Sequence, residues 1–400
     1  MKGFNAEKFV KDQINEIRRV IGNEKAVIAV SGGVDSSTCA VLTHQAIGDN
    51  LACVILDDAF MREGEPEKVA ELLSQPPLNL PMKVERVQER FLTALGGLRD
   101  AEEKRKAFRK TFYETLSDVA KREGSKFLVQ GTILADIIET KGGIKTQHNV
   151  LEQIGISTRE LYGFKVVEPL MALLKHQVRQ VARYLKIPPE ISERQPFPGP
   201  GLSVRVVGEI TPDKLASLKK ATVAVESNLS QHSPSQYFAA IINNEEIFPR
   251  PNLRNLVNST ARHLKLSQIN VWVKVLADKA TGMKQRARRY GEIVAVTCRK
   301  DGGELYQPDF MKLDGLQKRI LSRMRSATRV LYEIGEGDGK QPYVVVVRAV
   351  KTEDFLKAKA AEIPWPTLQE TASQILRECP NVSSVYYDIT PKPPATIEME

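Results

Sequence analysis

The chain has 400 residues, of which 42% are hydrophobic and 27% charged, so it is long enough for two or three domains with sizeable cores. Its apolar runs stay short of the ~18 residues that a membrane-spanning helix needs, and its first ten residues are too polar for a signal peptide. These features exclude an integral membrane protein and predict a cytoplasmic one without a membrane partner.

The net charge of +9 is spread unevenly along the chain. Residues 250–329 carry 18 Lys and Arg against 6 Asp and Glu, a surplus of 12, so the other residues sum to −3. Because one segment carries the basic character, the overall charge does not by itself predict nucleic-acid binding. We therefore expect no nucleic-acid partner, with docking of a tRNA by this segment as the alternative.

The four cysteines are scattered and form no C-x-x-C pair. Spacing of this kind predicts small buried side chains in a reducing compartment, and it favours neither a metal site nor a disulfide framework. The cysteines therefore agree with a cytoplasmic location.

Short apolar runs alternate with helical patterns through the first 200 residues. Helices are expected at 6–21, at 99–122 and through Val178 and Tyr184, and buried strands are expected at 27–30, 51–56, 82–87, 127–130 and 166–170. This alternation predicts an α/β domain whose parallel sheet is covered on both faces. In such sheets the ligand lies outside the carboxyl ends of the strands, where Ser31, Asp57 and Gly131 fall.

The stretch Val27–Ser37 joins a strand, a glycine turn and the start of a helix. Glycines let backbone N–H groups approach phosphate oxygens closely, and a helix N-terminus adds the positive end of its dipole. The three serine hydroxyl groups supply further donors. The stretch therefore predicts a phosphate-binding loop, with a tight turn that binds no ligand as the alternative.

This loop differs from the two commonest nucleotide-binding motifs. It lacks the Gly-Lys-Ser/Thr of the mononucleotide loop and the three glycines of the dinucleotide fingerprint. Ser31-Gly-Gly-Val-Asp-Ser-Ser37 resembles instead the pyrophosphate loop of the ATP pyrophosphatase (PP-loop) superfamily. The resemblance implies an adenine nucleotide alpha hydrolase-like domain at residues 1–200, which splits ATP between its α and β phosphates and adenylylates a carbonyl oxygen.

The run Gln195–Gly201 contains three prolines and two glycines, so it predicts a domain boundary. Beyond it we expect an α+β region with a strand at 203–209, a helix at 212–229 and a strand at 237–242. We divide this region into a first α+β unit with the basic segment, residues 201–335, and a second unit with the C-terminal tail, residues 336–400.

An internal repeat crosses the last third of the chain. Residues 292–297 and 343–347 are matching apolar runs, and each is followed by Asp-Phe, Leu-Gln and Ile-Leu pairs in the same order. Arg329–Ile334 then matches Ser384–Ile389. The agreement predicts a duplicated strand–helix–strand unit that pairs its apolar faces within a monomer, as an internal pseudo-dimer, or across a homodimer axis. Chance similarity between two α+β segments is the alternative.

Several further stretches follow the loop in a fixed order: Gln130–Thr132, Asp136–Glu139, Ile144–Val150, Glu168–Leu170, Arg194–Leu202 and Lys392–Glu398. With them, the chain resembles the ATP pyrophosphatase and C-terminal domains of GMP synthetase from about residue 8 onward. That family converts XMP to GMP. The resemblance implies a ligase that uses Mg²⁺ and ATP and adenylylates XMP, after which ammonia displaces AMP.

The resemblance also implies a role for each matching residue. The ATP site would comprise the loop, two residues flanking the adenine and one further glycine: Val30, Ser31, Gly32, Gly33, Val34, Asp35, Ser36, Ser37, Leu56 and Gly131. Asp35 and Asp136 would hold Mg²⁺, and the catalytic set would be Asp35, Asp136, Glu139, Lys145 and His148. Lys145, His148 and Asn149 would lie on a mobile lid that closes over the reacting centre. The acceptor nucleotide would be bound by Asn149 of this lid together with Arg288, Lys392, Thr396 and Glu398.

The residues themselves give these roles partial support. Asp136 and Glu139 are three apart on a presumed helix and so share a face. Transfer of AMP builds negative charge on phosphorus, which cations such as Lys145 would neutralise. A nucleotide phosphate needs paired Arg or Lys, which Lys284–Arg289 supplies. An exposed acidic helix face, a surface histidine at 148, a solvated basic segment and a stiff Lys-Pro-Pro tail are the alternatives.

No glutaminase domain precedes the loop, so ammonia would come from solution or from a separate glutaminase subunit. Glutamines stand at 147 and 195, and Ala59 follows the second strand, where the family usually has two histidines and a glycine. These departures leave two alternatives open. One is a divergent paralogue that acts on another purine nucleotide or a tRNA base, and the other is a non-catalytic nucleotide-binding regulator.

Overall fold

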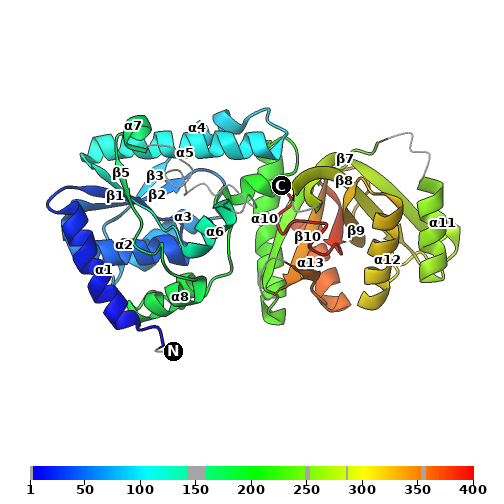
Figure 1. The fold of residues 1–400 in the computed structure, drawn as a ribbon. Coiled ribbons are helices and arrows are strands. Elements are labelled where there is room, and N and C mark those ends of the chain that lie inside the picture. Colours follow the sequence, from blue (N-terminus) through cyan, green and yellow to red (C-terminus); the bar gives the residue numbers. More distant parts are fainter. Residues whose placement is uncertain (1–2, 142–157, 248–252, 285–286, 353–356) are drawn as a thin grey trace. The chain divides into compact units, whose positions relative to one another are not determined.

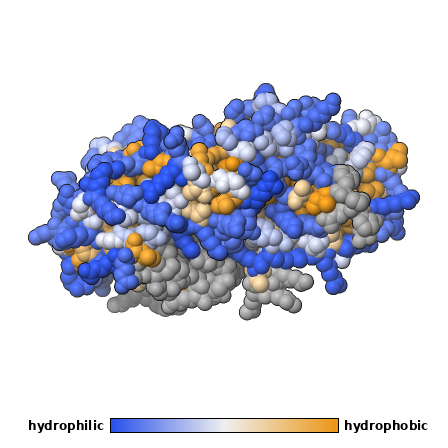
Figure 2. Space-filling model, turned by 90° about the horizontal axis from the view of Figure 1, so that it is seen from above, coloured by the Kyte–Doolittle hydropathy of each residue, from blue (hydrophilic) through white to orange (hydrophobic). Residues whose placement is uncertain are grey.

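The computed structural model describes residues 3–141, 158–247, 253–284, 287–352 and 357–400. The chain divides into two compact units (Figure 1): Met1–Leu95 with Lys106–Pro200, and Gly96–Arg105 with Gly201–Glu400. In the described part of the chain, no helix has the length and apolar character to cross a membrane. The face seen in Figure 2 is mostly polar, with apolar side chains in small groups.

The first unit contains a five-stranded sheet with the order β3-β2-β1-β4-β5, and all four neighbouring pairs are parallel. Its strands are β1 Ala26–Ala29, β2 Leu51–Asp57, β3 Met82–Arg86, β4 Phe127–Val129 and β5 Lys165–Val167. Its helices are α1 Ala6–Ile21, α2 Val34–Ile47, α3 Glu65–Ser74, α4 Gln88–Leu95, α5 Ala101–Glu123, α6 Leu134–Lys141, α7 Thr158–Tyr162, α8 Lys175–Tyr184 and α9 Pro189–Ser192, with the first turn of α5 assigned to the second unit. The predicted parallel α/β sheet is confirmed.

Both faces of this sheet are buried because successive side chains of a strand point to opposite sides. Ile28 packs into a cluster with residues of α1, α2 and α8. Val27 packs into a second cluster with residues of α5. Strand order runs from β1 outward through β2 and β3 and then returns to the other side of β1 at β4. The switch point of the sheet therefore lies between β1 and β4, the place where open α/β sheets bind ligands.

Ala59, directly after β2, has a left-handed backbone with φ 74°. This conformation costs an L-residue about 1–2 kcal/mol and suits glycine. Ala59→Gly is therefore expected to raise the free energy of unfolding by up to about 1 kcal/mol, since the greater freedom of the unfolded glycine chain offsets part of the gain. Urea unfolding measures the change. Ala70→Gly, the same change inside α3, is the matched control and should lower stability by about 1 kcal/mol; equal losses in both variants would contradict the strain argument.

The second unit contains a seven-stranded sheet with the order β11-β10-β12-β9-β8-β7, in which β6 also pairs with β10. Its strands are β6 Gln236–Asn243, β7 Val271–Lys284, β8 Ala287–Cys298, β9 Ala327–Glu336, β10 Tyr343–Lys351, β11 Lys359–Ala360 and β12 Val382–Asp388. Its helices are α10 Pro212–Leu229, α11 Leu253–Leu264, α12 Phe310–Arg323 and α13 Trp365–Glu378. Residues 201–335 and 336–400 thus contribute strands to one sheet.

The duplication is visible in the topology of this sheet. β8-α12-β9 and β10-α13-β12 are each two parallel strands joined by a helix, and β9 and β12 meet as an antiparallel pair. α12 begins at Phe310 and α13 at Trp365, and their second strands begin at Ala327 and Val382. From the helix through the second strand, equivalent residues are therefore 55 positions apart. The two halves are related by a pseudo-twofold axis between β9 and β12.

Two aromatic contacts repeat across this axis. Phe310 of α12 packs edge-on against Tyr387 of β12, with ring centroids 6.2 Å apart. Trp365 of α13 packs in the same way against Tyr332 of β9, at 6.0 Å. Each helix therefore begins against the strand of the opposite half, and both helices cover the sheet face on which Tyr332 and Tyr387 lie. The two copies of the repeat thus pair within one chain, which is one of the two predicted arrangements.

The structure corrects the detailed alignment of the repeat. The order of residue pairs in the sequence matches Leu316 with Leu368, whereas the 55-residue spacing makes Leu313 the equivalent of Leu368. Phe355, which was matched with Phe310, lies outside the described residues, and Trp365 is the equivalent of Phe310. The error arose because the two loops that precede the helices differ in length.

The predicted strand at 203–209 is wrong. Residues 201–204 form a 3₁₀ helix, and only Val206 makes a β-bridge, to Ile241. Apolar β-branched residues suggested a strand, but the carbonyl oxygens of this segment have a different partner. The buried Lys104 ammonium donates to the oxygens of Val206 at 2.7 Å and Gly208 at 2.9 Å, and it also pairs with Glu400.

The four cysteines are free and buried, as predicted.

Candidate active site

The predicted phosphate loop lies at the switch point of the first sheet. Val30 N–H donates to the Val54 carbonyl oxygen at 2.8 Å, which extends the pairing of β1 with β2 by one residue. Gly32 then takes φ 72°, and Gly33 precedes the first residue of α2. The free N–H groups of the first turn of α2 therefore lie beside the loop, as an anion site requires.

Hydroxyl groups fix the shape of this loop. The Ser31 N–H donates to Ser36 Oγ at 3.2 Å, and that hydroxyl donates to the Gly33 carbonyl oxygen at 3.2 Å. Ser31 Oγ lies 3.2 Å from Ser36 Oγ. Ser37 is fully buried at the first turn of α2. Ser31 and Ser36 are thus placed together at the loop, whereas the Ser37 side chain points into the protein.

Two glycines allow close approach of other elements to the loop. A Cβ atom on Gly131, just beyond β4, would lie 2.8 Å from Ser36 N and 2.9 Å from Asp35 C. A Cβ atom on Gly32 would lie 2.7 Å from Val69 Cγ2 of α3. Both distances are shorter than van der Waals contact, so only glycine fits at either position. The structure therefore brings Gly131 directly against the loop.

Asp35 lies at the first turn of α2 and has an incomplete set of partners. Its Oδ2 accepts a hydrogen bond from Lys175 Nζ at 2.6 Å, whereas its buried Oδ1 has no hydrogen-bond partner among the described residues. Burial raises the pKa of the Asp35 carboxyl, and the nearby Asp136 charge adds to this. Lys175 and Arg179 lower the pKa, but by less. A buried carboxylate held in this way is typical of a functional site.

Sequence reasoning missed three cationic residues near the loop. Lys175 and Arg179 lie on α8, and Arg179 Nη2 donates to the Arg194 carbonyl oxygen at 3.2 Å. Arg194 Nη1 would be 3.4 Å from a Cβ atom on Gly32, and the same group pairs with Glu65. Lys175 opens α8, where its charge opposes the helix dipole. That unfavourable position was the signal that could have identified it.

The two residues expected to flank adenine do not share a surface. Val30 packs into the cluster with α1, α2 and α8, and Leu56 packs into the cluster with α5 on the other face of the sheet. Both are buried. At the end of β2, Asp57 accepts hydrogen bonds from Gln88 at 2.5 Å and from Arg86 at 3.1 Å.

The predicted acidic pair lies on α6. Asp136 Oδ2 accepts a hydrogen bond from the Ile133 N–H at 3.1 Å, near the start of the helix. Glu139 lies on the same helix, one turn later, and its side chain is outside the described part of the structure. Lys145, His148 and Asn149 also lie outside the described residues.

The remaining predicted residues lie in the second unit. Arg288 Nη1 donates to Glu102 at 2.8 Å. The backbone of Lys392 pairs with Ala358. Thr396 Oγ1 accepts a hydrogen bond from Arg329 at 2.9 Å. The structure thus places Lys392 and Thr396 on one tail segment, while Arg288 lies in the long β7–β8 hairpin, whose strand β7 bridges to that tail at Gly282 and Ala395.

The C-terminal tail is anchored by a buried charge network. Glu398 pairs with the buried Arg205 at 3.0 Å and accepts a hydrogen bond from Gln236 at 3.1 Å. Asp388 Oδ2 accepts from both Arg329 and Arg348 at 2.9 Å, and all three side chains are fully buried. Arg348 also donates to the carbonyl oxygens of the tail at residues 396 and 397. Glu398 therefore has a structural role in this unit.

Parts of the chain match known protein families. Residues 6–188 match the PP-loop domain family, and residues 336–399 match the GMP synthase C terminal domain family. Among solved structures, an NMN synthetase from Francisella tularensis is similar at 18% identity with a TM-score of 0.39, covering 50% of this chain and 79% of that one.

Curated relatives match over almost the whole chain. A subunit of the glutamine-hydrolyzing GMP synthase of Sulfurisphaera tokodaii is 44% identical, covering 99% of this chain and 100% of that protein. The GMP synthase subunits of the same name from Methanopyrus kandleri and Archaeoglobus fulgidus are 39% and 38% identical with the same coverage. The chain therefore belongs to the family of these GMP synthase subunits.

Proposed function

We propose that this protein is the ATP pyrophosphatase subunit of a GMP synthase, a ligase that converts XMP to GMP. The C2 oxygen of XMP attacks the α-phosphorus of ATP, and pyrophosphate leaves. Ammonia then attacks C2, and AMP leaves with the oxygen. The observation that carries the proposal is the full-length similarity to subunits of glutamine-hydrolyzing GMP synthases, and the phosphate loop at the switch point supports it.

The residues of the first unit would bind and orient ATP. Backbone N–H groups of the loop and the first turn of α2 would hold the pyrophosphate, with Ser31 and Ser36 as further donors. Lys175 and Arg194, which lie beside Asp35 and Gly32, would balance the negative charge that develops as the phosphorus–oxygen bond breaks. Gly131 would leave the backbone of the loop accessible to the phosphates, because it has no side chain to collide with Asp35 and Ser36.

Asp35 and Asp136 would hold the Mg²⁺ ion that accompanies ATP. The fit is supported by the buried Asp35 Oδ1, which has no partner in the part of the chain that the structure describes, and by the neighbouring Asp136 charge that raises the pKa of Asp35. Two carboxylates suit Mg²⁺, which takes its other ligands from phosphates and water. When bound, the ion neutralises phosphate charge, and Lys175 holds Asp35 in place for it.

Acceptor binding is assigned to Arg288, Lys392, Thr396 and Glu398 in the second unit and to Asn149 on the lid. Arg288 and Lys392 supply the cations that a nucleotide phosphate needs. Glu139, Lys145 and His148 keep their proposed roles at the lid and the reacting centre. The ammonia would come from a glutaminase partner, in keeping with the name of the relatives. The reaction would take place in the cytoplasm.

Release of AMP and pyrophosphate from the purified protein tests this function. With Mg-ATP, ammonium and mildly alkaline pH, where free NH₃ is available, we expect AMP release that requires XMP and is matched by GMP formation. The matched control replaces XMP by IMP, which has no C2 oxygen. AMP release that does not depend on XMP, or binding of ATP without AMP release, would contradict the proposal. Other purine nucleotides, tRNA or a regulatory role would then be tested.

A further inference from the structure

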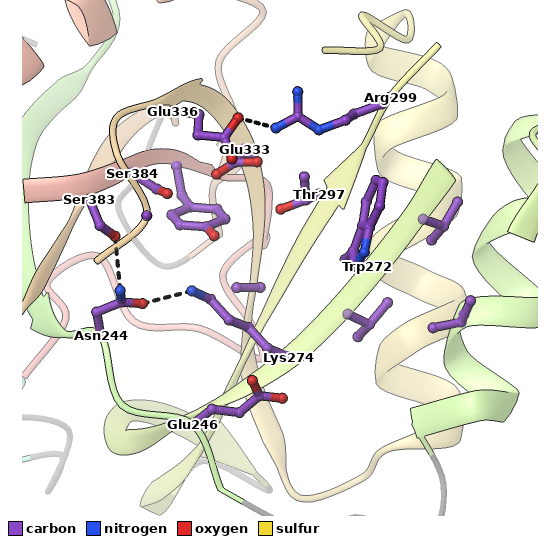
Figure 3. A pocket seen from close by; sticks show the side chains of 16 residues that line it. Asn244, Glu246, Trp272, Lys274, Thr297, Arg299, Glu333, Glu336, Ser383 and Ser384 are labelled. Atoms are coloured by element: carbon purple, nitrogen blue, oxygen red, sulfur yellow. Dashed lines mark hydrogen bonds and ion pairs between the residues drawn. The ribbon is translucent and has the colours of Figure 1, made fainter. Parts of the chain in front are cut away.

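A pocket of about 600 Å³ opens in the second unit, away from the tail segment (Figure 3). Its polar lining comes from the segment after β6, from the first residues of β7 and β12, and from the ends of β8 and β9 with Arg299 just beyond β8. Glu333 and Tyr386 lie on the sheet face opposite to Tyr332 and Tyr387, because side chains alternate along a strand. The pocket thus lies mainly on the face that α12 and α13 leave uncovered.

One carboxylate oxygen of Glu333 lacks a partner in this pocket. The residue is only 3% exposed, and its Oε2 has no hydrogen-bond partner among the described residues. Burial raises the pKa of this carboxyl, and the hydroxyl groups of Thr297 and Ser384 offset only part of the effect. A buried polar atom without a partner costs about 1–3 kcal/mol, so proteins seldom keep one without a reason.

The lining carries one more carboxylate than it carries cations. Arg299 pairs with Glu336, and Lys274 donates to Asn244 Oδ1 at 2.8 Å. Lys274 therefore remains as the one lining cation for both Glu246 and Glu333. Burial raises the pKa of Glu246 as well. The charge balance of the lining favours a ligand with one positive charge.

The pseudo-twofold axis shows what kind of cation is missing. Glu333 of β9 is equivalent to Asp388 of β12, 55 positions later. Asp388 is bound by Arg329 and Arg348. Their equivalents beside Glu333 are Ser384, by the 55-residue spacing, and Thr297, which follows the β8 residue paired with Tyr332 as Arg348 follows the β10 residue paired with Tyr387. Two guanidinium groups are thus replaced by two short hydroxyl side chains, and this leaves space in front of the carboxylate.

An aromatic ring is placed equivalently in the two halves. Phe238 pairs with Arg348 across β6 and β10, and Trp272 pairs with Thr297 across β7 and β8. The guanidinium of Arg205 covers the Phe238 ring at 4.1 Å. Trp272 is 50% exposed, and Arg299 lies 6.0 Å from its ring. Trp272 and Glu333 line the same pocket with Thr297 between them (Figure 3). An indole face in one pocket with a buried carboxylate is a favourable place for a flat cation.

We propose that this pocket binds a guanidinium group, which pairs with Glu333 and lies against Trp272. The group would make the contacts to Glu333 that Arg329 and Arg348 make to Asp388. A planar guanidinium matches a carboxylate through two parallel hydrogen bonds and stacks on an aromatic face, which an ammonium ion does less well. The proposal does not depend on the catalytic function assigned to the first unit.

Fluorine NMR of the full-length protein tests the pocket. The sequence holds two tryptophans, so 5-fluorotryptophan gives two resonances, and Trp272→Phe identifies that of Trp272. Methylguanidinium chloride is expected to shift the Trp272 resonance saturably in the millimolar range and to leave the Trp365 resonance in place. Tetramethylammonium, which has the same charge and no N–H donor, should not shift it. An equal response to both cations, or no response to methylguanidinium, would overturn the proposal.

Two variants assign the response to Glu333. Glu333→Gln keeps the shape and removes the charge, and it should weaken binding at least tenfold, whereas Glu246→Gln, the matched control in the same pocket, should weaken it no more than threefold. Ser384→Arg supplies an internal guanidinium at the position equivalent to Arg329, and it should block the pocket. Equal losses in the two glutamine variants, or unchanged binding in Ser384→Arg, would show that methylguanidinium binds elsewhere.

The source of the guanidinium follows from a second comparison. If the acetylated peptide amide Gly-Arg-Gly binds no more tightly than methylguanidinium, the pocket serves a small guanidinium compound. A peptide at least tenfold tighter would assign the group to an arginine side chain of a partner protein. Both results support the proposal, which no response to methylguanidinium would already have overturned.

Discussion

Asp35→Asn is expected to lower kcat for XMP-dependent AMP release by about 100-fold or more, because it removes the buried charge that we assign to Mg²⁺ and to the orientation of Lys175. Burial and Asp136 raise the pKa of Asp35. Its folded-state pKa therefore lies above its unfolded value, and the ionised carboxylate opposes folding at neutral pH. The same substitution should raise the melting temperature.

The pH dependence of the wild-type protein carries the same sign. The contribution of Asp35 to the free energy of unfolding falls as pH rises from the unfolded pKa of an aspartate to the raised folded pKa. The difference in melting temperature between Asp35→Asn and the wild type, measured without Mg²⁺, should accordingly widen over this pH range. Asp49→Asn, an exposed substitution on the segment after α2, is the control and should change neither activity nor melting temperature. A variant Asp35→Asn that keeps more than half of the wild-type kcat would contradict the assigned role.

Asp388→Asn is expected to lower the free energy of unfolding by about 3–5 kcal/mol. The substitution removes the one acceptor that Arg329 and Arg348 share at 2.9 Å, and it leaves two fully buried guanidinium groups without their carboxylate. These two arginines also hold the tail through the Thr396 side chain and carbonyl oxygen. Loss of tail order should follow, so binding of the acceptor nucleotide should weaken together with stability.

Urea unfolding, monitored by circular dichroism, measures this loss, and limited proteolysis of the tail measures its order. Burial alone would raise the pKa of Asp388, but Arg348 and Arg329 outweigh burial and hold the pKa below its usual range. Its contribution is therefore present at neutral pH and is lost only as pH falls through that lowered value. Glu362→Gln, on an exposed residue of the same unit, is the control. A loss below about 1 kcal/mol for Asp388→Asn would show that the network is less important than its burial indicates.

The sequence by itself determined the nucleotide-binding half of the protein. Ser31–Ser37 between a strand and a helix specifies an anion site because glycine conformation and helix dipoles are local properties. The alternation of strands and helices determined the parallel sheet, and hence the position of Gly131 beside the loop. Ala59 is a further local example. The related family usually has a glycine at this position, and the backbone of Ala59 has the left-handed conformation that favours glycine. The repeat was likewise visible in the sequence, because each copy must bury the same apolar face.

Only the tertiary structure decided which charged residues meet. Lys175 and Arg194 lie 140 and more positions beyond Asp35 and Gly32 in the chain and reach the loop through the packing of α8 and the proline-rich junction. Residues 203–209 have the composition of a strand, yet Lys104, about 100 residues earlier, binds their carbonyl oxygens. The contrast between Asp388, which holds two arginines, and Glu333, which holds none, depends on strand register. Local sequence cannot encode such pairings, because a buried charge is stabilised by whichever distant group the fold places beside it.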